Sequence, residues 1–250
     1  MVVLTAEQFI RPPVSVCIAT YNGEKFILQQ LQSILAQLSE YDEVIISDDS
    51  STDQTLAIIY SLNDSRIKVF PGQTFRSPIK NFEFALQQAS HDYIFLSDQD
   101  DIWVEGRVDA MMKVLETADM VVCDHSVIDE QGNILMPSYF ELVPSRPGLL
   151  HNLKKNTYYG CCMAFRRRVL EKAFPFPKDV PLHDIWLGFV SEIYFKTIFL
   201  DYPYTLYRKH ANNATTGTEI KSSNSLLKKL QIRYNTVKYL PTLLFRNLKK

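Results

Sequence analysis

The sequence predicts an α/β protein whose mainly parallel sheet is flanked by helices. Short runs rich in β-branched and aromatic residues alternate with stretches of helical periodicity across the first 125 residues. Polar and acidic residues follow most of these runs at the point where each run ends. The composition is that of an ordinary globular protein, because 46% of the 250 residues are hydrophobic and 22% are charged.

The first half of the chain supplies five predicted strands and the helices between them. We expect strands at residues 14–19, 43–47, 67–70, 93–97 and 120–123, and helices at 24–38, 53–62, 80–90 and 105–117. Strands that alternate with helices at this spacing form right-handed crossovers, which make neighbouring strands parallel. The first 125 residues are therefore expected to form a nucleotide-binding layer.

The second half of the chain is less regular. Residues 136–157 contain three prolines and are expected to form an extended or loop-rich excursion. The stretch 158–173 predicts a strand that enters a helix, and 181–195 predicts a capped, mostly buried helix. Residues 208–225 are small and polar, which is typical of a loop.

Charge is distributed unevenly along the chain. Residues 221–250 hold eight Lys or Arg and no acid, which leaves −9 on residues 1–220 of a chain whose net charge is −1. This basic segment interleaves apolar and basic residues, so it is either a helix packed on the domain or an amphipathic segment on an anionic membrane. Pro241 interrupts the pattern. An acidic body with one basic tail argues against a nucleic-acid binder.

The cysteines and the N-terminal residues predict a cytoplasmic protein. The four cysteines show no metal-ligand spacing and two of them are adjacent, which favours a reduced compartment over a disulfide framework. No basic segment followed by a sustained apolar run opens the chain, and no stretch of about 20 apolar residues occurs. The alternative that the basic tail allows is a peripheral position on the cytoplasmic face of the inner membrane.

The stretch "IFLSDQDDIW" (94–103) places Asp98, Asp100 and Asp101 directly after a strand that reads as buried on both faces. Neighbouring carboxylates repel one another unless positive charge lies between them. Oxygen ligands suit Mg²⁺ or Mn²⁺, and a Mg²⁺ site with one or two carboxylates is usually completed by substrate phosphates. The alternative is that Asp100 or Asp101 caps a helix that begins near Glu105.

The other predicted strands also end in polar residues: "TYN" (20–22), "DDSSTD" (48–53), "PGQ" (71–73) and "DH" (124–125). In an open parallel sheet, ligands bind in the crevice beyond the carboxyl ends of the strands. Turns alone also favour Asp, Asn, Ser and Gly at such positions. Acids at three of the strand ends exceed what turns require, so we expect a functional cluster at this edge.

These motifs together resemble glycosyltransferase family 2, with its GT-A fold. The resemblance is carried by "VSVCIATYNGEKFILQQLQSILAQ" (14–37), "EVIISDDSSTDQT" (43–55), "IKNFEFALQQAS" (79–90), "YIFLSDQDDIW" (93–103), "YYGCCMAFRR" (158–167), "HDIWL" (183–187) and "YRKHANNATTG" (207–217). The last motifs are similar to the rhamnosyltransferase-like and lipooligosaccharide galactosyltransferase-like branch. The resemblance implies a GT-A domain over residues 1–220 and a basic C-terminal segment over 221–250. Within that domain, 14–125 would bind the nucleotide-sugar and 126–220 the acceptor.

The resemblance also implies a nucleotide-sugar site. Thr20, Tyr21 and Asn22 would hold the base and ribose of the donor. Either Asp48 or Asp49 would accept a hydrogen bond from the imide N–H of a pyrimidine. A carboxylate suits that donor, because charge-assisted hydrogen bonds are stronger than neutral ones.

Further matches concern the diphosphate and its cation. Lys80 and Asn81 correspond to a family position near the donor. Asp98 and Asp100 correspond to the family's DXD pair, with Asp98 near the ribose and Asp100 on an Mn²⁺ or Mg²⁺ ion. His210 matches a late histidine that completes the metal site in some GT-A enzymes, although a single histidine is as often structural.

Asp184 matches the catalytic base of the family. The usual motif there is Glu-Asp, whereas this chain has His183-Asp184, which leaves the base intact and makes the contacts of His183 an open question. From its position alone Asp184 would be a helix N-cap, a role compatible with facing a ligand crevice. A single carboxylate opposite the leaving group predicts in-line displacement with inversion.

The resemblance therefore implies an inverting, metal-dependent glycosyltransferase. It would move a hexosyl or deoxyhexosyl group from a UDP- or dTDP-sugar to a hydroxyl of a saccharide or lipid-linked glycan, in lipooligosaccharide, O-antigen or capsule synthesis. The first alternative is a non-catalytic nucleotide-sugar or glycan-binding module. The second is a sugar nucleotidyltransferase, which would need a Gly-rich loop where "ATYNGEKF" offers only Gly23 with Lys25. A phosphoaspartate receiver would not account for residues 126–250.

Overall fold

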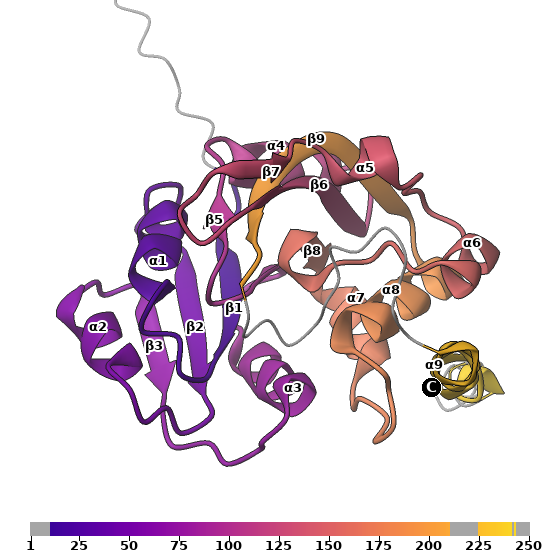
Figure 1. Cartoon of the computed structure of the whole chain (residues 1–250), viewed down its shortest axis with the longest axis horizontal. Helices are drawn as coiled ribbons and strands as arrows, with labels where there is room; N and C mark the ends of the chain where they lie inside the picture. The colour runs from indigo at the N-terminus through magenta and orange to yellow at the C-terminus, as the bar shows by residue number, and fades with distance from the viewer. Residues whose placement is uncertain (1–10, 211–224, 242, 244–250) are drawn as a thin grey trace, which may run out of the picture.

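The computed structural model describes residues 11–210, 225–241 and 243. Among these residues nine strands form one sheet, ordered β3-β2-β1-β4-β8-β6-β9-β5, with β7 paired to β6. The sheet curls, so that β1 to β3 and the β6–β9 pair lie at a steep angle to each other (Figure 1). The predicted α/β class with helices flanking a largely parallel sheet is confirmed.

The parallel part of the sheet matches the sequence prediction closely. It consists of β1 (Val14–Thr20), β2 (Glu43–Asp48), β3 (Ile67–Phe70) and β4 (Tyr93–Ser97). Most of these strands are buried on both faces, as expected for continuous apolar runs that are covered by helices on both sides. The register pairs Thr20 with Asp48 and Ile18 with Ser97, so β1, β2 and β4 end at the same edge.

The remaining strands complete the sheet. These are β5 (Ile102–Trp103), β6 (Met120–Ile128), β7 (Ile134–Met136), β8 (Met163–Arg166) and β9 (Thr197–Arg208). Strand β8 is antiparallel to both β4 and β6, whereas β6 and β9 are parallel. The sequence prediction placed Asp124 and His125 after the end of a strand, and this is wrong, because both lie buried inside β6.

Helices connect the strands and cover the sheet. They are α1 (Ile27–Leu35), α2 (Thr55–Ser61), α3 (Pro78–Gln88), α4 (Arg107–Leu115), α5 (Tyr139–Leu142), α6 (Leu149–Lys154), α7 (Arg167–Ala173), α8 (His183–Tyr194) and α9 (Leu226–Val237), with a 3₁₀ turn, η1, at Gly160–Cys162. The Pro-rich excursion 136–157 thus holds two short helices, α5 and α6. Helix α3 begins with a side-chain cap, since Ser77 Oγ accepts from the Lys80 N–H and Pro78 follows the cap.

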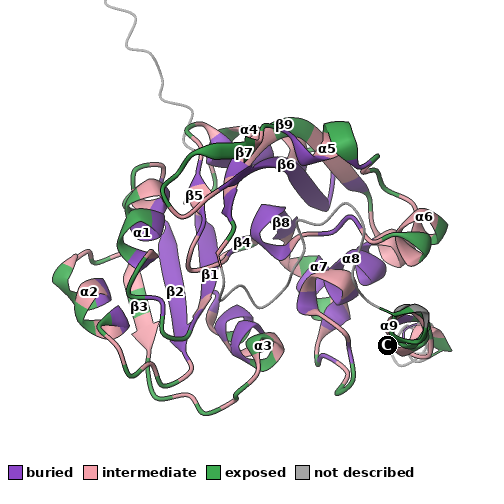
Figure 2. Cartoon of the chain, viewed as in Figure 1, coloured by how far each residue is buried: buried purple, intermediate pink, exposed green. Residues whose placement is uncertain are grey.

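The core lies between the sheet and its helices. Figure 2 shows the strands as mostly buried, while the outer faces of α2 and α9 are exposed. One hydrophobic cluster runs from Val14 on β1 to Leu243 beyond α9. Across residues 11–210, 225–241 and 243, no helix has both the length and the apolar character needed to span a bilayer.

The C-terminal helix α9 packs on the domain. Arg233 donates to the carbonyl oxygens of Leu153 and Lys154 at the end of α6, at 2.7 Å and 2.6 Å. The Tyr194 hydroxyl donates to the Leu243 carbonyl oxygen at 2.5 Å. One face of the predicted basic segment is therefore part of the fold. The predicted boundary between residues 220 and 221 falls outside the described residues.

Candidate active site

The predicted polar cluster gathers at the carboxyl edge of the parallel strands. Strands β1, β2 and β4 end there, and the chain continues into the loops that carry the sequence-predicted donor and DXD residues. The start of α8 and the end of β9 reach the same place, because Asp184 acts electrostatically on Asp98 and His210 contacts Asp100. The fold therefore brings together residues that are more than 100 positions apart.

The loop after β1 is held by Gln99, the residue between the two DXD acids. The Tyr21 N–H donates to Gln99 Oε1 at 2.9 Å, and Gln99 Nε2 donates to the Tyr21 carbonyl oxygen at 3.1 Å. A Cβ at Gly23 would lie only 2.5 Å from Gln99 Oε1, so a side chain there would displace the Gln99 amide. The Tyr21 ring itself is exposed and free to contact a ligand. Sequence reasoning missed Gln99.

Asn22 joins the first loop to the loop after β2. Its N–H donates to Ser51 Oγ at 2.9 Å, and its Oδ1 accepts from the Thr52 N–H at 2.8 Å. The residue has φ 47°, in the left-handed region that Asn tolerates better than most side chains. The predicted donor residue Asn22 therefore fixes the relative position of two loops at the sheet edge.

Asp48 and Asp49 have different surroundings. Asp48 is fully buried and accepts from Thr20 Oγ1 at 2.8 Å and from both the N–H and Oγ of Ser51, at 2.9 Å and 2.5 Å. Asp49 is half-buried and accepts from the N–H groups of Phe75 and Ser77. Since each carboxylate oxygen accepts more than one bond, Asp49 has acceptor capacity left at the surface, whereas Asp48 and Thr20 support the loop from below.

The two adjacent predicted donor residues of α3 differ in burial. Asn81 is buried; its Oδ1 accepts from Ser47 Oγ at 2.5 Å and its Nδ2 donates to the Thr20 carbonyl oxygen at 3.2 Å. Lys80 is exposed on the first turn of the helix. Asn81 therefore ties together the ends of β1 and β2, and Lys80 is the one of the two that a ligand can reach.

Asp98, Asp101 and Cys161 form a compact group of potential ligands. One ligand atom from each lies within 4.8 Å of the other two. Asp101 is buried, its Oδ1 accepts from the Arg208 N–H at 2.9 Å, and its Oδ2 has no hydrogen-bond partner among the described residues. Burial, with Asp100 nearby, raises the pKa of Asp101 to about 7. Burial and the neighbouring charges of Asp101, Asp100 and Asp184 also raise the pKa of Asp98 well above its usual value.

Asp100 and His210 meet at the same edge. His210 Nε2 lies 2.8 Å from Asp100 Oδ2, and both side chains are largely buried. The His210 ring also packs at 5.1 Å from the Phe26 ring, which fixes its orientation from the other side. The pair that the family resemblance assigned to a metal is thus in direct contact through these two atoms.

Arg208 shapes the backbone around the acids. Its Nε donates to the Asp100 carbonyl oxygen at 2.9 Å and its Nη1 to the Glu130 carbonyl oxygen at 3.0 Å, while Nη2 donates to Gln29 Oε1 at 2.7 Å. Arg107 is also buried, and its Nη2 donates to the Cys161 carbonyl oxygen at 2.6 Å. Sequence reasoning missed both arginines and Cys161, because no local pattern links residues this far apart.

The acids are not helix caps. Helix α4 begins at Arg107 with Gly106 as its N-cap, and α8 begins at His183 with Leu182 as its N-cap, neither with a side-chain cap bond. The alternative cap roles of Asp100, Asp101 and Asp184 are therefore wrong. Asp184 lies in the first turn of α8, where the helix dipole favours a negative charge.

Asp184 is linked to the acid cluster through η1. Its Oδ2 accepts from the Gly160 N–H at 3.3 Å and its Oδ1 from the Ile185 N–H at 2.6 Å. The next residue after Gly160 is Cys161, which approaches Asp98 and Asp101. Burial raises the pKa of Asp184 to about 6 even though backbone N–H groups stabilise its charge. At neutral pH this carboxylate is mostly ionised and can accept a proton.

His183 is buried beside the base. Its ring stacks on Phe82 with centroids 4.1 Å apart, and neither ring nitrogen has a hydrogen-bond partner among the described residues. Burial lowers its pKa to about 3, so it is neutral. A Cβ at Gly160 would lie 2.6 Å from His183 Nε2. The histidine that replaces the usual glutamate is thus packed between α3 and η1.

The acid cluster fits a divalent cation. Among the described residues Asp101 Oδ2 is a buried acceptor with no hydrogen-bond partner, and burial together with neighbouring carboxylates raises the pKa values of Asp98 and Asp101. Oxygen donors of this kind are the ligands that Mg²⁺ and Mn²⁺ prefer. Asp100 acts electrostatically on Asp98 and Asp101, and its Oδ2 contacts His210 Nε2, so a further oxygen and a nitrogen lie beside the cluster.

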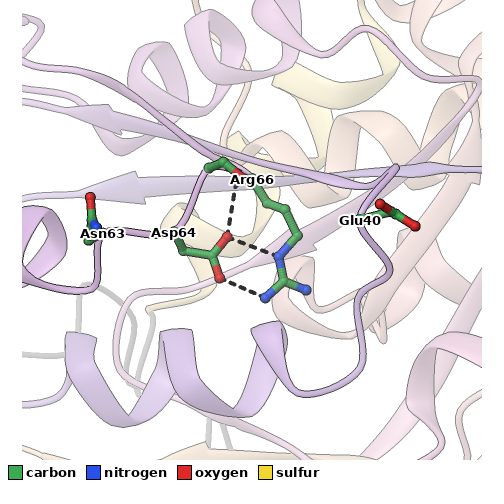
Figure 3. Close-up of a pocket in the computed structure, with 5 residues that line it drawn as sticks. Glu40, Asn63, Asp64 and Arg66 are labelled. Carbon is green, nitrogen blue, oxygen red and sulfur yellow. Dashed lines mark hydrogen bonds and ion pairs between the residues drawn. The ribbon is translucent and has the colours of Figure 1, made fainter.

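A separate hollow lies at the opposite edge of the sheet. Figure 3 shows Glu40, Asn63, Asp64 and Arg66, which line it. Its volume is about 380 Å³. Arg66 is already engaged there, because its guanidinium forms two hydrogen bonds with the Asp64 carboxylate and donates to the Leu38 carbonyl oxygen. These residues precede β3 and adjoin the start of β2, so the hollow is remote from the acid cluster.

The model of the family described as "Glycosyl transferase family 2" matches residues 15–174. The chain belongs to this family. The match includes the loop after β1, the acids after β2 and β4, and Gly160 with Cys161, and it ends before Asp184. The family assignment makes the protein a glycosyltransferase and agrees with the resemblance that the sequence motifs carry.

Curated relatives have glycosyltransferase names. The chain is 30% identical over 215 residues to the dTDP-rhamnosyl transferase RfbG of Shigella flexneri, covering 78% of this chain and 72% of that protein. It is 28% identical over 224 residues to the UDP-Glc:alpha-D-GlcNAc-diphosphoundecaprenol beta-1,3-glucosyltransferase WfaP of Escherichia coli, covering 88% of this chain and 87% of that protein.

Solved structures share the fold of this family 2 protein. S. aureus TarS 1–349 in complex with UDP-GlcNAc superposes with a TM-score of 0.66 at 21% identity, covering 95% of this chain and 76% of that one. The mannosyltransferase PcManGT of Pyrobaculum calidifontis, in complex with GDP-Man and Mn²⁺, gives a TM-score of 0.62 at 19% identity, covering 97% and 66%. The GT-A fold predicted from the motifs is confirmed.

Proposed function

We propose that this family 2 protein transfers a sugar from a UDP- or dTDP-linked donor to a hydroxyl of a growing bacterial surface glycan, with inversion and with a bound divalent cation. The observation that carries the proposal is the convergence of Asp98, Asp100, Asp101 and Asp184 at the carboxyl edge of the sheet. Relatives named for dTDP-rhamnosyl and UDP-glucosyl transfer support the donor class. The name of one relative includes diphosphoundecaprenol, which supports a lipid-linked acceptor.

The donor nucleotide would lie over the loops after β1 and β2. Tyr21 offers an exposed ring for the base, and Asp49 is the better candidate than Asp48 for the pyrimidine imide, because the Asp48 carboxylate is buried and bonded to Thr20 and Ser51. Lys80, exposed on α3, lies within the chain's donor half and would contribute positive charge. Asn22 and Asn81 would hold these loops in place rather than touch the donor.

Mg²⁺ or Mn²⁺ would be held by Asp100 and His210, together with the carboxylates of Asp98 and Asp101. A cation there would neutralise charge on the departing nucleoside diphosphate. Asp184 would take the proton of the acceptor hydroxyl as that oxygen attacks, because its carboxylate acts electrostatically on Asp98 and is carried by a separate element, α8. General-base assistance of this kind contributes about 10²–10⁴-fold to the rate.

The decisive experiment compares Asp184→Asn with the wild type in donor binding and in transfer. We expect Asp184→Asn to bind UDP or dTDP with Mn²⁺ as the wild type does, and to lose transfer by about 10²–10⁴-fold. Asp92→Asn is the matched control, since Asp92 is an exposed carboxylate before β4. Near-normal turnover by Asp184→Asn would remove it as the base. If the wild type bound the nucleotides without any turnover, the non-catalytic module would be the better description.

A further inference from the structure

The outward face of α9 carries a row of apolar side chains. Leu227 is 79% exposed, Leu230 52%, Tyr234 67% and Val237 37%. Their spacing of three, four and three residues places them on one side of the helix. Large apolar residues scattered singly over a surface need no explanation, but a continuous row on one helix face marks an interaction surface.

The opposite face of α9 is anchored to the domain. Arg233 donates to the carbonyl oxygens at the end of α6, and Thr236 is buried. Beyond the helix, Lys238 forms an ion pair with Asp179 at 2.7 Å, and the Tyr239 ring packs edge-on against Trp186 of α8, with centroids 6.1 Å apart. The helix is therefore a fixed part of the surface, and its apolar row is presented outward. Figure 1 shows α9 at the rim of the molecule, nearly end-on.

Charge decides between the possible occupants of this face. Residues 221–250 carry eight Lys or Arg and no acid. Two copies of the chain that met through α9 would bring together two segments that each hold basic residues and no acid, and like charges across an interface oppose association. An anionic phospholipid surface is complementary, because it attracts basic residues electrostatically and accepts apolar side chains below its headgroups.

We propose that the outer face of α9, defined by Leu227, Leu230, Tyr234 and Val237, docks on an anionic phospholipid surface. The neighbouring helix α6 adds Leu150, which is 81% exposed. Helix α9 packs on α8, whose first turn carries Asp184, so docking would hold the candidate base close to the membrane. The docking itself does not rest on the proposed function. Only its benefit does, because a base held near the membrane would serve transfer to a lipid-linked acceptor.

Vesicle flotation of the full chain tests the proposal without donor or acceptor. We expect binding to phosphatidylcholine vesicles that contain phosphatidylglycerol, and much weaker binding to phosphatidylcholine alone. The combined variant Leu227→Ser, Leu230→Ser and Tyr234→Ser should bind the anionic vesicles at least about tenfold more weakly, because three apolar anchors are lost. Its melting temperature should be unchanged, since these side chains are exposed.

A matched control removes exposed apolar surface elsewhere. The variant Ile134→Ser with Leu135→Ser lies on β7, and both side chains are exposed in the native chain. It should bind anionic vesicles as the wild type does. The proposal is overturned if wild type and α9 variant bind the vesicles equally, or if the wild type binds none. It is also overturned if the wild type is a dimer that the α9 variant converts to a monomer. None of these outcomes affects transfer to a short soluble acceptor, which tests the proposed function separately.

Discussion

Replacing Gly160 with alanine should test how tightly His183 is held beside the candidate base. The added Cβ would lie 2.6 Å from His183 Nε2, closer than carbon and ring atoms approach in proteins. The ring cannot retreat toward α3, because it already stacks on Phe82 with centroids 4.1 Å apart. Overpacking of this kind costs about 1–3 kcal/mol. At about 2–4 °C per kcal/mol for a chain of this size, the melting temperature should fall by about 2–12 °C.

A double-mutant cycle separates this clash from any other cost. In the His183→Ala background the ring is gone, so adding Gly160→Ala should change the free energy of unfolding by less than about 0.5 kcal/mol. Denaturant titration of the two single variants, the double variant and the wild type measures all four corners. The reasoning would be refuted if Gly160→Ala cost the same in both backgrounds, since its effect would then not arise from the histidine.

Three further predictions concern charge. Transfer should decline as the pH falls below about 6, because burial raises the pKa of Asp184 to about 6 and only the ionised carboxylate accepts a proton; a rate profile flat to well below pH 6 would contradict this. Burial lowers the pKa of His125 to about 3, so the unfolded chain takes up a proton near pH 6.5 that the folded chain does not, and stability is lost as the pH falls from 6.5 toward 3. His125→Phe should therefore make the free energy of unfolding, measured by urea titration, depend less on pH across that window. An unchanged pH dependence would contradict the role given to His125. Asp100→Asn should weaken Mn²⁺ binding, measured calorimetrically, by about tenfold or more, whereas Asp92→Asn should not.

The parallel half of the fold could be predicted because its signals are local. Strands β1, β2 and β4 are largely apolar runs, and acids lie at or directly after the ends of β2 and β4 in the sequence itself. The carboxyl-edge rule then placed Asp98 and Asp100 beside the loop after β1 without any knowledge of the second half.

The parts that could not be predicted depend on contacts between distant residues. Strand β6 continues through Asp124 because Ser138 Oγ and the N–H groups of Tyr139 and Phe140 satisfy its carboxylate, and nothing near Asp124 in the sequence announces those donors. Arg208 bonds to Gln29 across 179 positions. Such partners become visible only once the chain is folded, so the residues that support the site were missed while the acids themselves were found.

The two buried arginines explain why the acid cluster is suited to a cation. Arg208 donates to the carbonyl oxygens of Asp100 and Glu130, and Arg107 donates to the carbonyl oxygen of Cys161. These bonds fix the backbone that carries the acids, yet the pKa values of Asp98 and Asp101 stay raised and Asp101 Oδ2 stays unpaired among the described residues. An arginine bonded directly to these carboxylate oxygens would have lowered their pKa values and occupied their lone pairs. Because these bonds fall on backbone oxygens, Asp101 Oδ2 remains available among the described residues, and a cation bound there would supply positive charge at the acids.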